Sequence, residues 1–226
     1  MKPILIEHAT IVNEGKREAG SVWIREGKIA EVYRKDDPIP SNVRQDSQTI
    51  DASGKLLLPG VIDDQVHFRE PGLTHKADIA TESKAAVAGG VTSFMEMPNT
   101  RPPAVTQQEL EKKYDTAARD SYANYSFYFG TTNDNIEEIR AIDPARVCGL
   151  KVFMGSSTGN MLVDDARALD RIFAESPVLI ACHCEDETTV RNNTHHYKEQ
   201  YGDDIPIGYH PIIRSEEACY LSSSLA

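Results

Sequence analysis

The feature that most constrains the fold of this 226-residue chain is an alternation that begins near residue 56. Short apolar runs alternate there with longer amphipathic stretches, a pattern typical of β-strands separated by helices. The apolar runs are Leu56–Ile62, Val91–Met97, Tyr125–Phe129, Val147–Phe153 and Val178–Cys182. The amphipathic stretches cover about residues 76–88, 106–120, 135–142 and 164–175. Each helix returns the chain along the sheet, so we expect parallel strands.

A partial (β/α)8 barrel of the TIM type is therefore the architecture predicted for residues 58–226. A complete barrel needs eight βα units and roughly 250 residues, and this segment supplies five apolar runs. A helix is expected from Ser215, with no stop signal before the last residue, so we expect a truncated barrel that lacks three units. The polar stretch Asn192–His210 carries two glycines and a proline, which predicts a long loop over the barrel mouth.

The first part of the chain, residues 1–57, has a different pattern. It holds short β-like runs separated by turn residues and shows no long helical period. These runs are Ile4–Ile6, Ser21–Ile24, Lys28–Tyr33 and Gln48–Ile50. We expect a small, incomplete β-sandwich-like domain in front of the barrel.

Charge and composition exclude several classes of protein. The formal net charge of −11 and the lack of a Lys/Arg run argue against nucleic acid as a partner. The first apolar run ends at Glu7, too early for a signal peptide, and no run is long enough to span a membrane. The four cysteines lack the dense spacing of a disulfide-stapled secreted domain. We expect a protein of the reducing cytoplasm.

The exit of the first barrel strand is unusually polar. Residues Asp63–Gly72 read Asp-Asp-Gln-Val-His-Phe-Arg-Glu-Pro-Gly. Residues two apart in a strand point to the same side, so Gln65 and His67 are both expected to face the barrel mouth, where the active sites of such barrels lie. A lone histidine is more often a structural polar residue, but Arg69 and Glu70 directly after it favour a functional site.

A second polar cluster ends the fifth apolar run, in Ala181-Cys182-His183-Cys184-Glu185-Asp186. The two cysteines are two residues apart and share a face opposite to His183, so we interpret them as packing residues and not as a thiolate site. Glu185 is expected to orient a neighbouring side chain. Ser156 and Ser157 have no base near them in the sequence, so a serine nucleophile is not expected.

These segments resemble known proteins. The polar strand exit is similar to the first-strand motif of the amidohydrolase superfamily, Asp-x-His-x-His, in the form that dihydroorotases continue as Arg-Glu-Pro-Gly. It follows Leu-Leu-Leu-Pro-Gly as in that family, and the similarity continues through Ala88–Thr92, Met97–Thr100 and onward to about Ala226. It thus covers nearly the whole chain, and several ordered motifs make chance agreement implausible.

The resemblance implies a site for one or two metal ions, usually zinc. Its ligands in the family are two first-strand histidines, a carboxylated lysine, two later histidines and a final aspartate. Here His67 corresponds to the second first-strand histidine, Lys151 to the lysine that carbon dioxide carboxylates, and His183 to a later histidine. Gln65 replaces the first histidine, and a neutral amide oxygen binds zinc poorly. The catalytic aspartate and a further histidine are expected beyond Ala226, so no catalytic residue is assigned within this chain.

The resemblance also implies a substrate. Arg69 can fork two hydrogen bonds onto a carboxylate, and Asn99 resembles the dihydroorotase residue that shares this contact. A metal-activated water would then hydrolyse the cyclic amide of dihydroorotate reversibly to N-carbamoyl-aspartate, in pyrimidine biosynthesis. The alternative for Arg69 is a surface ion pair with Glu70.

Two other functions are left open. Loss of a metal histidine at Gln65 suggests a non-catalytic dihydroorotase-like partner of aspartate transcarbamoylase. A hydantoinase or allantoinase acting on another cyclic amide is the second alternative. Both a homo-oligomer and an association with aspartate transcarbamoylase are compatible with the sequence, and the fragment alone is expected to be inactive.

Overall fold

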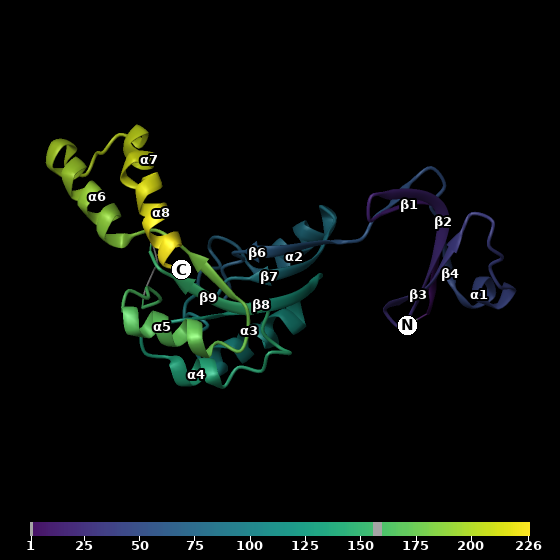
Figure 1. Ribbon diagram of the computed structural model, residues 1–226. Coiled ribbons are helices and arrows are strands. Elements are labelled where there is room, and N and C mark those ends of the chain that lie inside the picture. Colours follow the sequence, from purple (N-terminus) through teal and green to yellow (C-terminus); the bar gives the residue numbers. More distant parts are fainter. Residues whose placement is uncertain (1, 156–159) are drawn as a thin grey trace. The chain divides into compact units, whose positions relative to one another are not determined.

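The computed structural model describes residues 2–155 and 160–226 and divides into two compact units, Met1–Gly60 and Val61–Ala226 (Figure 1). The first unit is a small sheet with one short helix, and the second is a layered α/β unit. Ser156 and Ser157 lie outside the described residues. Within the part of the chain described, no helix is both long enough and apolar enough to cross a bilayer.

The first unit is built on one five-stranded sheet. Its elements are β1 (Ile4–Asn13), β2 (Lys16–Arg25), β3 (Lys28–Arg34), α1 (Ser41–Asp46), β4 (Gln48–Asp51) and β5 (Leu56–Leu57). Strands β1, β2 and β3 pair antiparallel, whereas β4 and β5 pair parallel with β1. The predicted β-runs are confirmed, and helix α1 was not anticipated.

The predicted first barrel strand, Leu56–Ile62, is wrong at its start. Leu56 and Leu57 pair with Thr10 and Ile11 of β1 and belong to the first unit. Barrel strand β6 begins only at Val61. Pro59 and Gly60 separate the two strands, because proline cannot donate a ladder hydrogen bond and glycine weakens a strand interior.

The second unit contains five parallel strands in the order β10-β9-β8-β7-β6. They are β6 (Val61–Val66), β7 (Val91–Glu96), β8 (Asn124–Gly130), β9 (Gly149–Phe153) and β10 (Ile180–His183). Each strand pairs with the next along the chain, and the sheet curls as half of a TIM-type barrel. The predicted parallel α/β architecture is confirmed.

Helices connect successive strands and pack on the sheet. They are α2 (Ile79–Ala88), α3 (Gln107–Asp120), α4 (Ile136–Arg140) and α5 (Ala166–Glu175). Side-chain caps from Asp78, Thr106 and Asp165 satisfy backbone N–H groups at three of their starts. The core between the two layers includes Phe94, Leu110, Phe127, Leu150 and Ile172, each at most 2% exposed. This layer fixes the strand ends that carry the candidate site.

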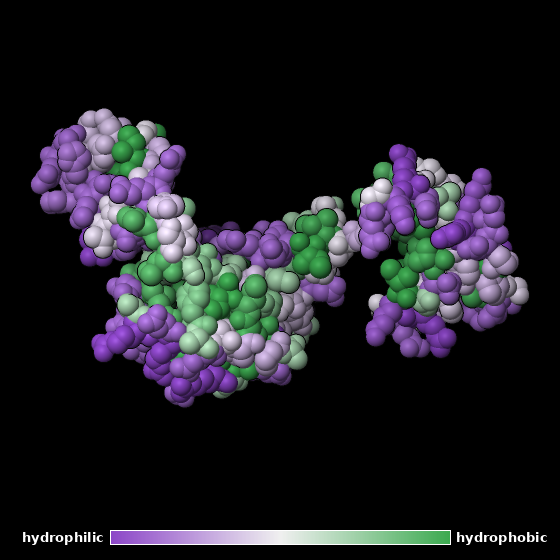
Figure 2. All heavy atoms as spheres, viewed as in Figure 1, coloured by the Kyte–Doolittle hydropathy of each residue, from purple (hydrophilic) through white to green (hydrophobic). Residues whose placement is uncertain are grey.

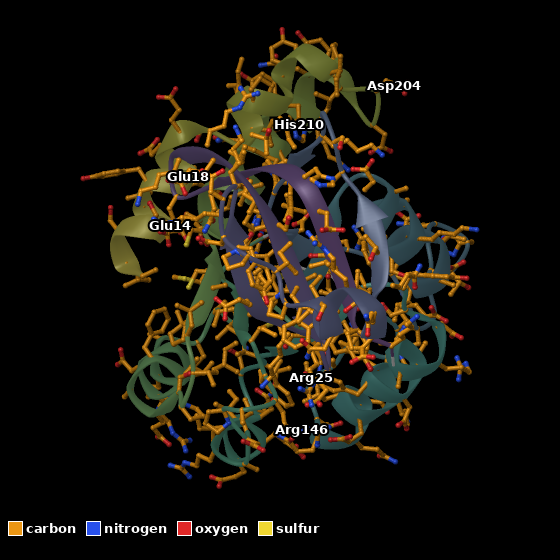
Figure 3. All side chains as sticks on the ribbon, turned by 90° about the vertical axis from the view of Figure 1, so that its right-hand side faces the viewer. Glu14, Glu18, Arg25, Arg146, Asp204 and His210 are labelled. Carbon is orange, nitrogen blue, oxygen red and sulfur yellow. The ribbon has the colours of Figure 1, made fainter. Side chains whose placement is uncertain are left out.

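The expected loop over residues 192–210 is wrong, because this part of the chain is largely helical. Helix α6 (Glu187–Tyr201) is followed by a 3-10 turn η1 (Ile207–Tyr209), α7 (His210–Ile213) and α8 (Glu216–Leu225). Asp204 and His210, labelled in Figure 3, lie on this segment. Helix α6 buries none of its residues, so it needs no apolar stripe and gave no helical period in the sequence.

Apolar side chains are exposed at both edges of the barrel sheet. In Figure 2, apolar residues of the second unit gather over strands β8 to β10. Val61 and Ile62 of edge strand β6 are 55% and 61% exposed, and Leu179, just before β10, is 68% exposed. Apolar residues in β6 and directly before β10 are therefore largely exposed in the described part of the chain.

Candidate functional site

The loop after β6 is held against the loop after β7. Gly72 has a φ of +79°, and a Cβ there would lie 2.0 Å from the carbonyl oxygen of Arg101. The backbone N–H of Arg101 donates to the carbonyl of Pro71 at 3.1 Å. Only glycine allows this approach, so the two loops meet directly.

Arg69 lies in the first of these loops with an unusual backbone conformation. Its φ of +69° is in the left-handed region, which arginine rarely adopts. Its N–H donates to Oε1 of Glu96 at 3.1 Å. The predicted alternative, an ion pair with Glu70, is wrong, because Oε2 of Glu70 instead accepts from the N–H of Ile79 at 2.9 Å, at the start of α2. Among the described residues, no carboxylate pairs with the Arg69 guanidinium.

His67 and Asn99 form a hydrogen bond across the two loops. Nδ1 of His67 lies 2.9 Å from Oδ1 of Asn99. With the amide oxygen as acceptor, Nδ1 carries the proton and Nε2 keeps its lone pair. Burial and then the positive charge of Arg69 lower the pKa of His67, while the Asn99 hydrogen bond opposes this shift. A neutral imidazole with its Nε2 lone pair available is the form that binds a metal ion.

Lys151 is a buried amine in apolar surroundings. It lies in β9, opposite Ala181 of β10, and is 5% exposed. Its Nζ is 5.1 Å from the ring centre of Phe153. Burial lowers the pKa of Lys151, and the nearby thiols of Cys182 and Cys184 oppose the shift only in part. No carboxylate pairs with Lys151 in the described part of the chain, so the neutral amine is favoured more than for an ordinary lysine.

His183 ends β10 and is oriented by a carboxylate. Its Nε2 lies 3.0 Å from Oε2 of Glu185. Glu185 in turn accepts from Arg214, whose Nε lies 2.7 Å from Oε1 and whose second guanidinium nitrogen contacts Oε2. The Nδ1 atom of His183 is then the ring nitrogen available for a metal ion. Cys182 and Cys184 pack against the hydrophobic core, as predicted.

Gln65 is not drawn into this arrangement. Its side chain is exposed, and its backbone N–H donates to Oδ1 of Asp63 at 3.1 Å. Among residues 2–155 and 160–226, no three His, Cys, Asp or Glu side chains meet as a metal-binding group. The donors that these strands do supply are His67 directly after β6, the buried Lys151 inside β9 and His183 at the end of β10.

Sequence reasoning missed two parts of the site. One is Glu96, which pairs with Lys113 of α3 beneath the Arg69 loop. The other is Arg214, at the end of α7, whose guanidinium donates to Glu185. A charged residue inside the apolar run Phe94-Met95-Glu96-Met97 was the available signal for the first. A contact between residues 29 positions apart gives no sequence signal for the second.

Comparison with known proteins identifies the class. Residues 54–202 match the Dihydro-orotase-like family, and the chain belongs to it. An allantoinase of Streptomyces avermitilis is 34% identical over 81% of this chain and 41% of its own length. A dihydroorotase of Thermococcus kodakarensis is 30% identical over 84% of this chain and 43% of its own length. The chain thus spans less than half of these two curated relatives.

A solved structure shows the same fold. The L-hydantoinase (dihydropyrimidinase) from Arthrobacter aurescens superposes with a TM-score of 0.87 at 25% identity, over 100% of this chain and 49% of the hydantoinase. The named relatives are therefore an allantoinase, a dihydroorotase and a hydantoinase, all similar to this chain at a moderate level. The family is established, and the substrate has to be argued from the site.

Proposed function

We propose that this chain contributes the substrate-carboxylate contacts and part of the metal site of a dihydroorotase. The observation that carries the proposal is the Arg69 guanidinium, which has no carboxylate partner among the described residues although it lies close enough to lower the pKa of His67. A charged group kept beside a functional imidazole without a counter-ion is suited to an anionic ligand. Dihydroorotate carries a carboxylate on its cyclic amide.

The charge balance of the strand ends supports an acidic substrate. Arg69 is the charged group that most lowers the pKa of His67, and it remains a cation when Lys151 is carboxylated. The whole chain is acidic, with a net charge of −11, so a guanidinium without a carboxylate partner among the described residues stands out at the site. Arg69 can hold a carboxylate through two parallel hydrogen bonds. The Asn99 amide, which lies beside His67, would help to hold the substrate ring next to the metal-binding side of that histidine.

The donor set fits a zinc site that the chain completes only in part. His67 through Nε2, His183 through Nδ1 and Lys151 after carboxylation would hold the ion. The Gln65 side chain is exposed, so a role as a weak fourth donor would require it to turn toward these three residues. Burial keeps the Lys151 amine more reactive toward carbon dioxide than an exposed lysine. A bound zinc ion supplies a hydroxide at neutral pH. Asn99 and Glu185 then fix the tautomers of the two histidines, which sets which ring nitrogen faces the ion.

A different cyclic amide is the second candidate. The allantoinase relative is as similar to this chain as the dihydroorotase relative, which favours this alternative. Dihydroorotate carries a carboxylate on its ring, whereas allantoin carries a neutral ureido group. The role of Arg69 therefore decides between them.

A non-catalytic partner of aspartate transcarbamoylase is the third candidate. The exposed Gln65 in place of a zinc-binding histidine is the observation that favours it.

All four cysteines are free thiols, in keeping with a reducing cytoplasm as the location of any of these proteins.

The test is an assay of the full natural polypeptide on dihydroorotate, allantoin and hydantoin, with zinc content measured in the same preparation. We expect turnover of dihydroorotate with bound zinc. Turnover of allantoin or hydantoin alone would replace the substrate assignment. A protein with neither zinc nor turnover on any of the three would favour the non-catalytic partner. In that case, co-purification with aspartate transcarbamoylase is the measurement to make.

A further inference from the structure

One ion pair of the second unit is completely buried. Neither of its residues belongs to the proposed substrate or metal site. Nζ of Lys113 lies 2.7 Å from Oε2 of Glu96, and the two side chains are 1% and 0% exposed. Glu96 ends β7, and Lys113 comes from α3 on the sheet's helical side. Burial raises the pKa of Glu96 and lowers the pKa of Lys113, and each partner's charge opposes these shifts.

Stability alone is a poor reason for such a pair. Desolvating two charges offsets most of their attraction, and a buried ion pair can often be replaced by apolar residues of similar volume without loss of stability. The contacts that the pair makes with other segments are more informative. Oε1 of Glu96 accepts the backbone N–H of Arg69 at 3.1 Å, and Nζ of Lys113 donates to the carbonyl of Met97 at 3.1 Å.

These two contacts reach the two loops that carry the proposed substrate contacts. The first holds Arg69 itself, in a left-handed conformation that arginine keeps only where its surroundings fix it. The second holds Met97, two residues before Asn99, whose side chain is bound to His67. The direct contact between the loops, at Gly72 and Arg101, leaves little room for either to shift alone.

We infer that the Glu96–Lys113 ion pair is a positioning device for substrate recognition, which fixes Arg69 and Asn99 relative to each other from beneath the site. This inference rests on the proposed function, because it assigns the two loops to one substrate. Glu96 and Lys113 are positioning residues and touch no substrate. Their effect is on binding geometry, so it belongs in KM more than in kcat.

A neighbouring ion pair provides a matched control. Lys112 precedes Lys113 on the same helix, and its Nζ lies 2.6 Å from Oε1 of Glu109. The Lys112 side chain is 54% exposed, and among the described residues the side chains of this pair hydrogen-bond to each other and to neither loop. Lys112→Met removes a lysine of the same helix without touching the site.

The experiment compares two double variants of the full natural polypeptide. E96M/K113M removes both charges and the acceptor for the Arg69 N–H. E96Q/K113M also removes both charges but keeps an amide oxygen as acceptor. Neither variant leaves a buried charge without a partner, so both are expected to fold. The readouts are KM and kcat for dihydroorotate and amide hydrogen exchange at Arg69 and at residues 97–102.

We expect E96M/K113M to raise KM about tenfold, with kcat changed much less, and to speed exchange at the Arg69 amide. E96Q/K113M should restore the protection of Arg69 and most of the KM, and K112M should match the unaltered protein. A merely structural role would instead reduce the active fraction, lowering apparent kcat at constant KM. Unchanged KM and unchanged Arg69 exchange in E96M/K113M would overturn the inference.

Failure of the proposed function has a different signature. If the unaltered protein does not hydrolyse dihydroorotate, the substrate assignment falls. The exchange measurements then decide alone whether the ion pair fixes the two loops.

Discussion

The two sides of the candidate site are held in different ways. On the β6–β7 side, His67, Asn99 and Arg69 are linked by hydrogen bonds to each other or to a fully buried ion pair. On the β9–β10 side, Lys151 has apolar surroundings, and His183 is 40% exposed and bound to Glu185. The first side is therefore organised by the half barrel itself, whereas the second depends on the helical segment that supplies Arg214.

This difference matters for energetics. On the first side, charges are buried and compensated, so removing one partner leaves the other without compensation. On the second side, the buried charge of Lys151 has no counter-ion among the described residues, so removing it takes away a desolvated charge. The same substitution at two lysines of similar burial should thus change the free energy of unfolding by very different amounts.

The largest expected effect tests this contrast directly. Lys113→Met should lower the free energy of unfolding by about 3–5 kcal/mol, because it leaves Glu96 buried without its cation. Lys151→Met should change it by less than about 1.5 kcal/mol, because volume is conserved and no ion pair is lost. Urea unfolding of both variants measures the difference. Equal destabilisation would show that the two environments are not distinct.

Arg69 should show the next largest effect, on activity. Arg69→Met loses the charge-assisted hydrogen bonds proposed between the guanidinium and the substrate carboxylate. The binding free energy should fall by about 1.5–3 kcal/mol, which lowers kcat/KM for dihydroorotate roughly 10- to 100-fold. Steady-state kinetics provide the measurement. Arg69→Lys is the matched variant, since it keeps the charge but not the planar fork. If both variants behave like the unaltered protein, the carboxylate is bound elsewhere.

On the other side, Glu185→Gln should weaken metal binding by about tenfold, because a carboxylate that orients a metal-binding histidine also strengthens it as a ligand. Zinc affinity measured by competition with a chelator is the readout. The control is Glu199→Gln on α6, where the carboxylate lies 3.2 Å from the exposed His195. Equal loss in both variants would indicate a general charge effect and not an effect on His183.

The smallest effect concerns thiol chemistry and leaves the fold intact. Burial raises the pKa of Cys148 and of Cys182 to about 11, so both stay protonated at pH 8. Cys219 is exposed. Because the thiolate is the reactive form, iodoacetamide at pH 8 should modify Cys219 well before Cys148 and Cys182, and their reaction should speed up as the pH rises toward 11. Peptide mapping gives the order, and early labelling of Cys148 would mean that the core opens readily.

The sequence predicted the parallel half barrel and the position of His67 and Arg69 at the exit of the first barrel strand, because apolar periodicity and strand parity report local geometry. Lys151 was expected to end its strand and instead lies inside β9, two residues before the strand ends. The sequence did not predict helix α6, which buries no residue and so has no apolar period. Nor did it predict the pairing of Glu96 with Lys113 or of Glu185 with Arg214. Those partners meet only through tertiary packing, which periodicity does not report. The division of Leu56–Ile62 between two sheets was missed for the same reason.

The hydrogen bond between His67 and Asn99 limits how the substrate range of such a protein could change. If Asn99 selects the substrate as proposed, it cannot be exchanged for specificity alone, because it also sets the tautomer of His67. A replacement that widens the range of rings would then also change which ring nitrogen of His67 is free to bind an ion. Selection for a new substrate would therefore have to proceed through residues that do not hydrogen-bond to His67, such as Arg69.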